Sequence, residues 1–394
     1  MTENTFPVGH IVHNGGCAVK TKGALIREFN QPWSIEEIEI GDPAKHEVKV
    51  QMEASGMCHS DHHLVTGGIP MLGFPVLGGH EGAGIVTEVG EGVEDVAVGD
   101  HVVMSFIPSC GRCPSCQAGL RNLCDLGAGL LGGVAISDGT HRIHTADGQP
   151  VFPMTLLGTF SPYMVVHESS VVKIDPSIPF EVACLVGCGV TTGWGSATHT
   201  AQIKPGEDVA VVGVGGVGMA ALQGAVASGA RNIFVIDPVE WKRDQALKFG
   251  ATHVYEDINA ALMGIAEATA GFMAKKVIVT VGELDGADVE NYMMITSKSG
   301  TCVLTAIGSM VDTNVTLNLA MMTLMQKNLQ GTIFGGGNPY YDIPQLLSMY
   351  KAGKLNLDDM VTRQYRLEQI NDGYKDMLEG RNIRGVIRYT DEDR

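Results

Sequence analysis

The sequence predicts an α/β fold with two domains: a mostly antiparallel β domain and a doubly wound parallel sheet. The chain of 394 residues is long enough for about two domains of ordinary size. From Lys20 to about Val172, short segments alternate apolar and polar residues between turn signals, as antiparallel strands do. From about Val190 to Thr332, strands instead alternate with helices, which is typical of a parallel sheet.

The strands of the first domain are clearest near its start. Residues 22–29 (KGALIREF), 34–40 (SIEEIEI) and 47–56 (EVKVQMEASG) alternate in this way, with glycine and proline turns between them. Residues 1–19 show no clear period, and we assign them no function. Six strands are expected in the second domain: Val209–Val212, Asn232–Asp237, His253–Glu256, Lys276–Val281, Thr301–Ile307 and Leu329–Phe334.

A glycine turn follows the first of these six strands. It has the spacing Gly-x-Gly-x-x-Gly at Gly213, Gly215 and Gly218, and it also contains Gly216 and Val217. Such glycines let the backbone turn tightly and approach a pyrophosphate, which the free N–H groups of the next helix bind. In this strand and helix context, the turn predicts a dinucleotide site.

An acidic residue lies where that site needs one. Asp237 ends the second strand, nineteen residues after Gly218, and can accept hydrogen bonds from ribose hydroxyls. A helix is expected to begin near Pro238. Because no basic pair follows Asp237 to neutralise a 2′-phosphate, the sequence favours NAD over NADP.

Composition excludes several classes of partner. The net charge of −17 argues against binding to nucleic acid or an anionic membrane. The chain has no apolar run long enough for a membrane span and no signal-like start, so we expect a cytoplasmic protein. In that setting its nine cysteines point to metal binding or catalysis rather than disulfides.

Four cysteines are crowded into one short segment, the lobe at about 108–126. They are Cys110, Cys113, Cys116 and Cys124. Four thiolates can complete a tetrahedron around one Zn²⁺ and leave no position open. Four free thiols at this density are the weaker reading, so the lobe predicts a structural zinc site.

A second set is spread along the chain: Cys58, His80 and Cys188. Two thiolates and one imidazole can hold Zn²⁺ with a fourth position open for water or substrate. Such a metal is a Lewis acid that can stabilise an alkoxide while its carbon releases hydride. From chemistry alone, buried core cysteines and histidine remain an equal alternative.

The motifs resemble those of zinc-dependent medium-chain alcohol dehydrogenases. Cys58-His-Ser-Asp, Gly79-His80-Glu81, the four-cysteine lobe, the segment 187–193 (GCGVTTG) and the glycine turn occur in that family's order. The resemblance runs from about Lys20 to Tyr389 and is closest to the liver-type long-chain subgroup. It implies a GroES-like catalytic domain, residues 1–189 and 333–394, and a Rossmann domain, residues 190–332. The extra loop Gly127–Pro153 would frame the pocket mouth or a subunit contact.

The resemblance also implies roles around the metal. Cys58, His80 and Cys188 would be the ligands of a catalytic zinc, so that each chain holds two zinc ions. Asp61 would orient His80, and Glu81 would lie behind the metal. Ser60 would pass the alcohol proton toward the ribose hydroxyls, and His63 would be the solvent end of that relay. The alternative for His63 is a plain surface histidine.

Five further positions match family contacts to cofactor or substrate. His59 stands where many relatives place an arginine on the pyrophosphate, so its role is less direct, and Arg384 would compensate. Thr192 would touch the nicotinamide side. Lys242 would lie near the adenosine ribose or be a solvated surface charge. Phe106 would line the substrate pocket or pack in the core.

A narrower resemblance concerns how the cofactor is used. Residues 53–84, 156–166 and 333–361 look like actinobacterial nicotinoprotein alcohol dehydrogenases. Those enzymes keep NAD(H) bound and pass electrons to an external acceptor, such as N,N-dimethyl-4-nitrosoaniline or the peptide-derived mycofactocin. The alternatives are an ordinary dehydrogenase with exchangeable NAD, a glutathione-dependent formaldehyde dehydrogenase, and a noncatalytic NAD-binding protein. The substrate would be a small alcohol or aldehyde.

One segment predicts self-association. Val311–Leu319 alternates as an exposed strand would, and in the family a comparable strand pairs with its twofold mate. An unpaired edge would favour aggregation. We therefore expect a homodimer or homotetramer.

Overall fold

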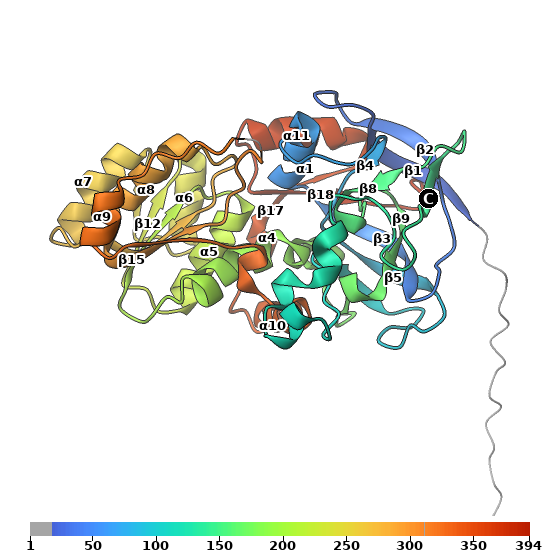
Figure 1. The fold of residues 1–394 in the computed structure, drawn as a ribbon, viewed down its shortest axis with the longest axis horizontal. Coiled ribbons are helices and arrows are strands. Elements are labelled where there is room, and N and C mark those ends of the chain that lie inside the picture. Colours follow the sequence, from blue (N-terminus) through green and yellow to red (C-terminus); the bar gives the residue numbers. More distant parts are fainter. Residues whose placement is uncertain (1–17, 311) are drawn as a thin grey trace, which may run out of the picture.

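The computed structural model describes residues 18–310 and 312–394, and these form two lobes side by side (Figure 1). Residues 1–17, which include most of the segment without an assigned function, lie outside the described part of the chain, as does Val311. No helix in the described ranges is long and apolar enough to cross a membrane.

The first lobe contains two sheets, which are antiparallel except for the pairs β4–β8 and β17–β18. The five-stranded sheet has the order β7 (Ile143–Thr145), β2 (Ser34–Ile40), β1 (Val19–Ile26), β4 (Val76–Leu77) and β8 (Phe152–Pro153). The larger sheet has the order β10 (Val171–Lys173), β6 (His101–Met104), β5 (Gly82–Val89), β3 (Glu47–Gly56), β18 (Arg384–Arg388) and β17 (Val361–Tyr365), with β9 (Tyr163–His167) also paired to β3.

The predicted strands of this lobe are confirmed. Residues 34–40 and 47–56 form β2 and β3 with the expected limits, while β1 ends at Ile26, before the predicted end at Phe29. Every residue of β3 is buried or half-buried, since β3 pairs with β5, β9 and β18. The pairing with β18 brings the C-terminal strand to the end of β3, next to Cys58.

The second lobe is one parallel sheet of six strands, as predicted. Its order is β13 (His253–Tyr255), β12 (Asn232–Ile236), β11 (Asp208–Val212), β14 (Ala274–Val279), β15 (Thr296–Leu304) and β16 (Asn328–Gly331). In chain order the strands read 3-2-1-4-5-6, the doubly wound arrangement of dinucleotide-binding folds. The order reverses between β11 and β14, and ligands bind at such a point.

Helices cover this sheet and connect it to the first lobe. The helices within the lobe are α5 (Gly216–Ala227), α6 (Glu240–Lys248), α7 (Ile258–Ala268), α8 (Val289–Met294) and α9 (Leu319–Leu324). The chain enters through α4 (Gly189–Gly195), which packs closely on α5 because Gly193 lacks a side chain. A Cβ at Gly193 would lie 2.0 Å from the carbonyl oxygen of Val217. The helices α10 (Pro339–Lys351) and α11 (Ile370–Leu378) belong to the returning chain.

Three details differ from the sequence predictions. The described residues 312–318 form no strand, because within one chain this segment lacks a neighbouring strand; Thr316 N–H donates to Gly286 O at 3.0 Å. Helix α6 begins at Glu240 rather than near Pro238. The loop 127–153 supplies β7 and β8 to the five-stranded sheet, and none of its residues lines the cavity described below. Its predicted place at the pocket mouth is therefore wrong, and a subunit contact stays a prediction.

Candidate active site

Three separate parts of the first lobe bring a set of metal-binding side chains together. Cys58 immediately precedes α1 (His59–Thr66), His80 and Glu81 lie in the turn between β4 and β5, and Cys188 immediately precedes α4. One potential ligand atom from each of these four residues lies within 4.8 Å of the others, and all four residues are buried. The predicted set is thus assembled from positions up to 130 residues apart in the chain.

His80 is oriented as a metal ligand would be. Its Nδ1–H donates to Asp61 Oδ1 at 3.0 Å, so that in the neutral imidazole the free lone pair is on Nε2. That Nε2 is buried and has no hydrogen-bond partner. Because buried polar atoms are normally paired, the unpaired lone pair beside two thiols fits Zn²⁺.

Asp61 fixes the local backbone as well as the imidazole. It accepts hydrogen bonds from Gly79 N–H and Cys58 N–H, both at 3.2 Å. The buried Asp61 carboxylate therefore holds in place the two segments that supply Cys58 and His80. Hydrogen-bond partners of metal ligands commonly have this role. The hydroxyl of Tyr374, a buried residue that sequence reasoning missed, lies beside this carboxylate.

The electrostatics favour a thiolate at Cys58. A hydrogen bond from the Cys188 thiol and the neighbouring His80 hold the pKa of Cys58 well below its usual range. The thiolate is the form that binds metal. Burial alone would raise this pKa, so the neighbours outweigh desolvation.

Arg384 lies deeper than predicted. Its guanidinium forms an ion pair with Glu81, and the residue is only 3% exposed. Gly189 N–H donates to the other Glu81 oxygen at 3.0 Å. A Cβ at Gly216 would lie 2.1 Å from the Arg384 side chain, so this glycine makes room for it. Arg384 therefore joins the metal cluster to the glycine turn.

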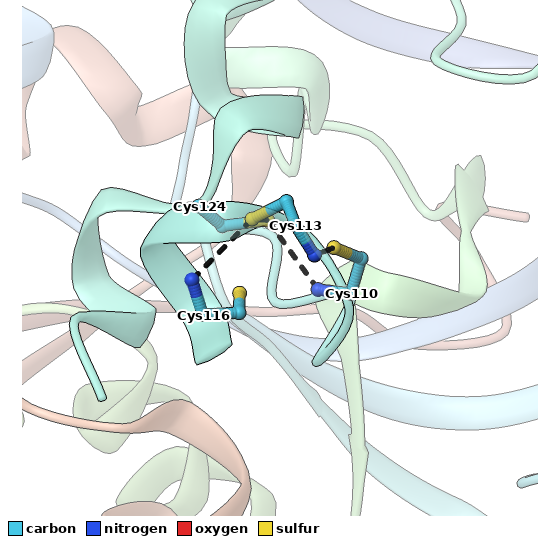
Figure 2. A group of neighbouring side chains, drawn as sticks. All are labelled: Cys110, Cys113, Cys116 and Cys124. Carbon is cyan, nitrogen blue, oxygen red and sulfur yellow. Dashed lines mark hydrogen bonds between the residues drawn. The ribbon is translucent and has the colours of Figure 1, made fainter. Parts of the chain in front are cut away.

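The four cysteines of the 108–126 lobe also converge (Figure 2). The four are Cys110, Cys113, Cys116 and Cys124, and their sulfur atoms lie within 4.8 Å of one another. The backbone N–H groups of Cys116 and Asp125 donate to Cys113 Sγ, each at 3.4 Å. The bond from Asp125 first, and then that from Cys116, lower the Cys113 pKa to about 7. This donor set fits a closed Zn²⁺ site without an open position.

A cavity of about 300 Å³ lies between the metal cluster and the second lobe. The predicted residues that line it are Cys58, His59, Ser60, His63, Phe106, Cys188, Thr192, Gly213, Gly215, Gly216, Val217, Asp237, Lys242 and Arg384. Sequence reasoning had placed these residues in one site, and the fold brings them to one wall or another of the same cavity. Gly218 lies outside it, where a Cβ would meet Gly213 O at 1.9 Å, so it serves the packing of the turn.

The glycine turn is braced by Asp237. Its carboxylate accepts Val214 N–H and Val239 N–H, both at 2.9 Å, and it still lines the cavity. The bond to Val239 also explains why α6 starts later than predicted, since it holds a turn outside the helix. Arg243, which the sequence prediction of NAD did not consider, donates to the carbonyl oxygens of Asp237 and Pro238. The Asp237 carboxylate would still repel a 2′-phosphate.

Two of the three histidines of α1, His59 and His63, line the cavity. Burial lowers the pKa of His59 to about 4, so its imidazole is neutral near pH 7 and offers a pyrophosphate a hydrogen bond rather than a charge. His63 is no surface histidine, since it is 8% exposed and its Nε2–H donates to Gly282 O at 2.8 Å. Gly282 was missed because no motif marks it. The Cys58 thiol lies 3.7 Å from Ser60 Oγ, near the cluster.

Aromatic rings form the apolar wall. Phe106 meets the His80 ring edge to face at 5.8 Å and the Phe334 ring at 5.5 Å. Phe334, Ile333 and Ile307 line the same cavity and were not predicted as site residues. They lie at or next to the last residue of a predicted strand, and nothing in their local sequence distinguishes them from core residues.

A dinucleotide cradle and an open thiolate–imidazole metal set that share one cavity define a zinc- and NAD-dependent dehydrogenase. Residues 44–176 match the family model "Alcohol dehydrogenase GroES-like domain", and residues 216–352 match "Zinc-binding dehydrogenase". The chain belongs to the zinc-dependent medium-chain alcohol dehydrogenase family and is an NAD- and zinc-dependent oxidoreductase acting on CH–OH donors.

Three similar proteins support this assignment. "Alcohol dehydrogenase B" of Mycobacterium tuberculosis (strain H37Rv) is 80% identical over 376 residues, covering 95% of this chain and 100% of the relative. "NDMA-dependent alcohol dehydrogenase" of Amycolatopsis methanolica is 44% identical, covering 94% and 100%. The crystal structure of benzyl alcohol dehydrogenase from Acinetobacter calcoaceticus is 27% identical, covers 94% and 100%, and superposes with a TM-score of 0.86.

Proposed function

We propose that this enzyme is a nicotinoprotein: it keeps NAD(H) bound through turnover, oxidises small alcohols to aldehydes, and transfers the electrons to an external acceptor. The full-length similarity to an NDMA-dependent alcohol dehydrogenase, at 44% identity, is the observation that carries this subtype. A natural acceptor of the mycofactocin kind fits this proposal. Because thiolate ligands need reducing conditions, we place the enzyme in the cytoplasm.

The cavity residues suggest how the chain would act on an alcohol. Zinc held by Cys58, His80 and Cys188 would supply Lewis-acid polarisation of the substrate oxygen. Bound NAD would supply the hydride acceptor. Ser60 would accept the hydroxyl proton, His63 would take the proton on toward solvent, and Thr192 would contact the nicotinamide. The external acceptor would take the hydride equivalent from the reduced cofactor, so that NAD would be restored without leaving the protein.

Other cavity residues would hold the cofactor. His59 and Arg384 would face the pyrophosphate together with the glycine turn, while Asp237 and Lys242 would face the adenosine ribose. Arg384 is already paired with Glu81, so its net attraction for phosphate is reduced. His59 contributes no full charge near neutral pH, and retention of NAD(H) must therefore come from enclosure as well as electrostatics.

The lining of the cavity favours an apolar substrate. Its lysine and arginine residues are Lys242, in α6 shortly after Asp237, and Arg384, which lies against Gly216 of the glycine turn. A glutathione adduct carries carboxylates that would need cationic partners at the substrate end. Phe106, Phe334 and Ile333 offer apolar contact instead. A primary alcohol with an aliphatic or aromatic body fits better than a glutathione adduct.

Metal and cofactor content tests this proposal directly. After extensive dialysis, denatured protein should release about one NAD(H) and two zinc ions per chain. The dialysed enzyme should also reduce N,N-dimethyl-4-nitrosoaniline with alcohol when no NAD is added. Two zinc ions without a dinucleotide would instead identify an ordinary dehydrogenase that exchanges NAD in every cycle.

Self-association is a second expectation. Apolar side chains gather near the segment that follows residue 311: Val315 is 58% exposed and Leu319 71% exposed. Burying them against a second copy would remove apolar surface from water. Sedimentation at micromolar concentration should therefore give a dimer or tetramer, and a monomer alone would contradict this expectation.

A further inference from the structure

One hydrogen bond connects the two lobes across the cavity. His63 lies in α1 of the first lobe, and Gly282 follows β14 of the parallel sheet, 219 residues later. The imidazole Nε2–H donates to the glycine carbonyl at 2.8 Å. Since both residues line the cavity, the bond lies on its wall rather than at a distance from it.

This bond lies where a dinucleotide is expected to cross the sheet. Gly282 comes three residues after the end of β14, beside β11, and the strand order reverses between these two strands. Ligands of doubly wound sheets bind outside the carboxyl ends of the strands at this point. The glycine turn after β11 lines the same cavity. A bridge from α1 to Gly282 therefore spans the cofactor region.

The two sides of the bridge are closely packed. A Cβ at Gly282 would lie 2.7 Å from Nε2 of His59. Any larger residue at position 282 would therefore displace the His59 ring, and glycine allows the loop to approach α1 this closely. His63 is almost fully buried, and burial protects its hydrogen bond from competing water. Neither side needs a conformational change to make this contact.

We propose that His63 and Gly282 form a latch that closes over bound NAD(H) and slows its release. The inference rests on the proposed nicotinoprotein function, which requires slow release. In this role His63 is a positioning residue that acts through the backbone of the coenzyme lobe. Before the cofactor can leave, the hydrogen bond must break and α1 must separate from the loop.

The latch can be separated from proton transfer. While Nε2–H donates to Gly282, that nitrogen cannot accept a proton, and only Nδ1, which lies against Gly68, has a free lone pair. A glutamine at position 63 can donate an amide N–H to the same carbonyl but cannot relay protons near neutral pH. An alanine can do neither.

The test compares NADH release from the wild type, His63→Gln and His63→Ala. Each purified full-length protein is saturated with NADH, and released NADH is trapped with an excess of an unrelated NADH-consuming dehydrogenase. Loss of one hydrogen bond should make release from His63→Ala roughly 3–10-fold faster. His63→Gln should release NADH within about twofold of the wild-type rate, although both variants lose the proton relay. Zinc content and circular dichroism check that the variants remain folded.

The outcomes separate the latch from the proposed function. Equal release from all three proteins would overturn the latch, and so would equally fast release from both variants, since the glutamine would then have failed to replace the donor. If the wild type releases NADH quickly but only His63→Ala is faster still, the latch stands and cofactor retention during turnover fails. Slow wild-type release with the same pattern supports both.

Discussion

Replacing Cys58 by serine should remove the proposed catalytic zinc and nearly all turnover, while the fold and the proposed structural zinc remain. A hydroxyl is a poor zinc ligand compared with a thiolate, and Cys58 is the thiol of the cluster whose pKa the surrounding groups lower. Lewis-acid polarisation contributes several kcal/mol to transition-state stabilisation. Its loss should lower kcat/KM by more than about 10³-fold.

Cys184→Ser provides the matched control. This second buried cysteine lies close in sequence to Cys188, but its thiol donates to Glu181 O at 3.4 Å and is not part of the metal set. Burial raises its pKa, so it stays a neutral thiol. Zinc analysis should give one ion per chain for Cys58→Ser and two for Cys184→Ser. Near-normal activity of Cys58→Ser would exclude the proposed ligand set.

Sequence reasoning succeeded where a motif or a period carries local information. The strands β2 and β3 follow from apolar patterns with the predicted limits, and the six strands of the parallel sheet follow with errors at several of their ends. The two clusters of potential metal ligands and the glycine turn also form as spacing and family resemblance predict. Each of these features is encoded by a few neighbouring residues, and so the order of motifs was enough to bring them into one expected site.

Specific contacts between residues far apart in the chain could not be predicted from the sequence. The ion pair of Arg384 with Glu81 joins residues 303 positions apart and depends on β18 pairing with β3. The bond from His63 to Gly282 depends on how the two lobes face each other. Nothing in the sequence around Arg384 or Gly282 indicates that either residue has a partner in a distant segment. Arg384 was expected to contact the pyrophosphate, and the structure adds the Glu81 carboxylate, which reduces the net charge of Arg384 available to a phosphate.

The strand expected over Val311–Leu319 is not formed by the described residues 312–318 of the single chain, for a related reason. Alternation predicts an extended segment, but a strand exists only when another strand completes its hydrogen bonds. Within a single chain the described residues 312–318 have no such neighbour. The prediction therefore concerns an assembly of two chains, and a sequence pattern does not distinguish pairing within a chain from pairing between chains.

Replacing Cys113 by serine should, in contrast to Cys58→Ser, act mainly on stability. The lobe around the four cysteines has little regular structure: α2 (Pro114–Gln117) and two 3₁₀ turns, Arg121–Leu123 and Asp125–Gly129. A structural zinc contributes its binding energy directly to folding. We expect a loss on the order of 4 kcal/mol, which at about 2–4 °C per kcal/mol lowers the thermal midpoint by about 10 °C.

The Cys113→Ser substitution should also affect the apolar wall of the cavity. Asn122, inside the lobe, donates its side-chain N–H to Ile333 O at 3.1 Å, and Ile333 lines the cavity beside Phe334. Loosening the lobe should therefore raise KM for the alcohol more than it lowers kcat. Ser115→Ala is the control. The Ser115 hydroxyl donates to Asp125 Oδ1 at 2.7 Å, and its loss should leave KM unchanged and shift the thermal midpoint by no more than about 2 °C. If Cys113→Ser kept two zinc ions and the wild-type midpoint in differential scanning calorimetry, the four thiols would not be a structural zinc site.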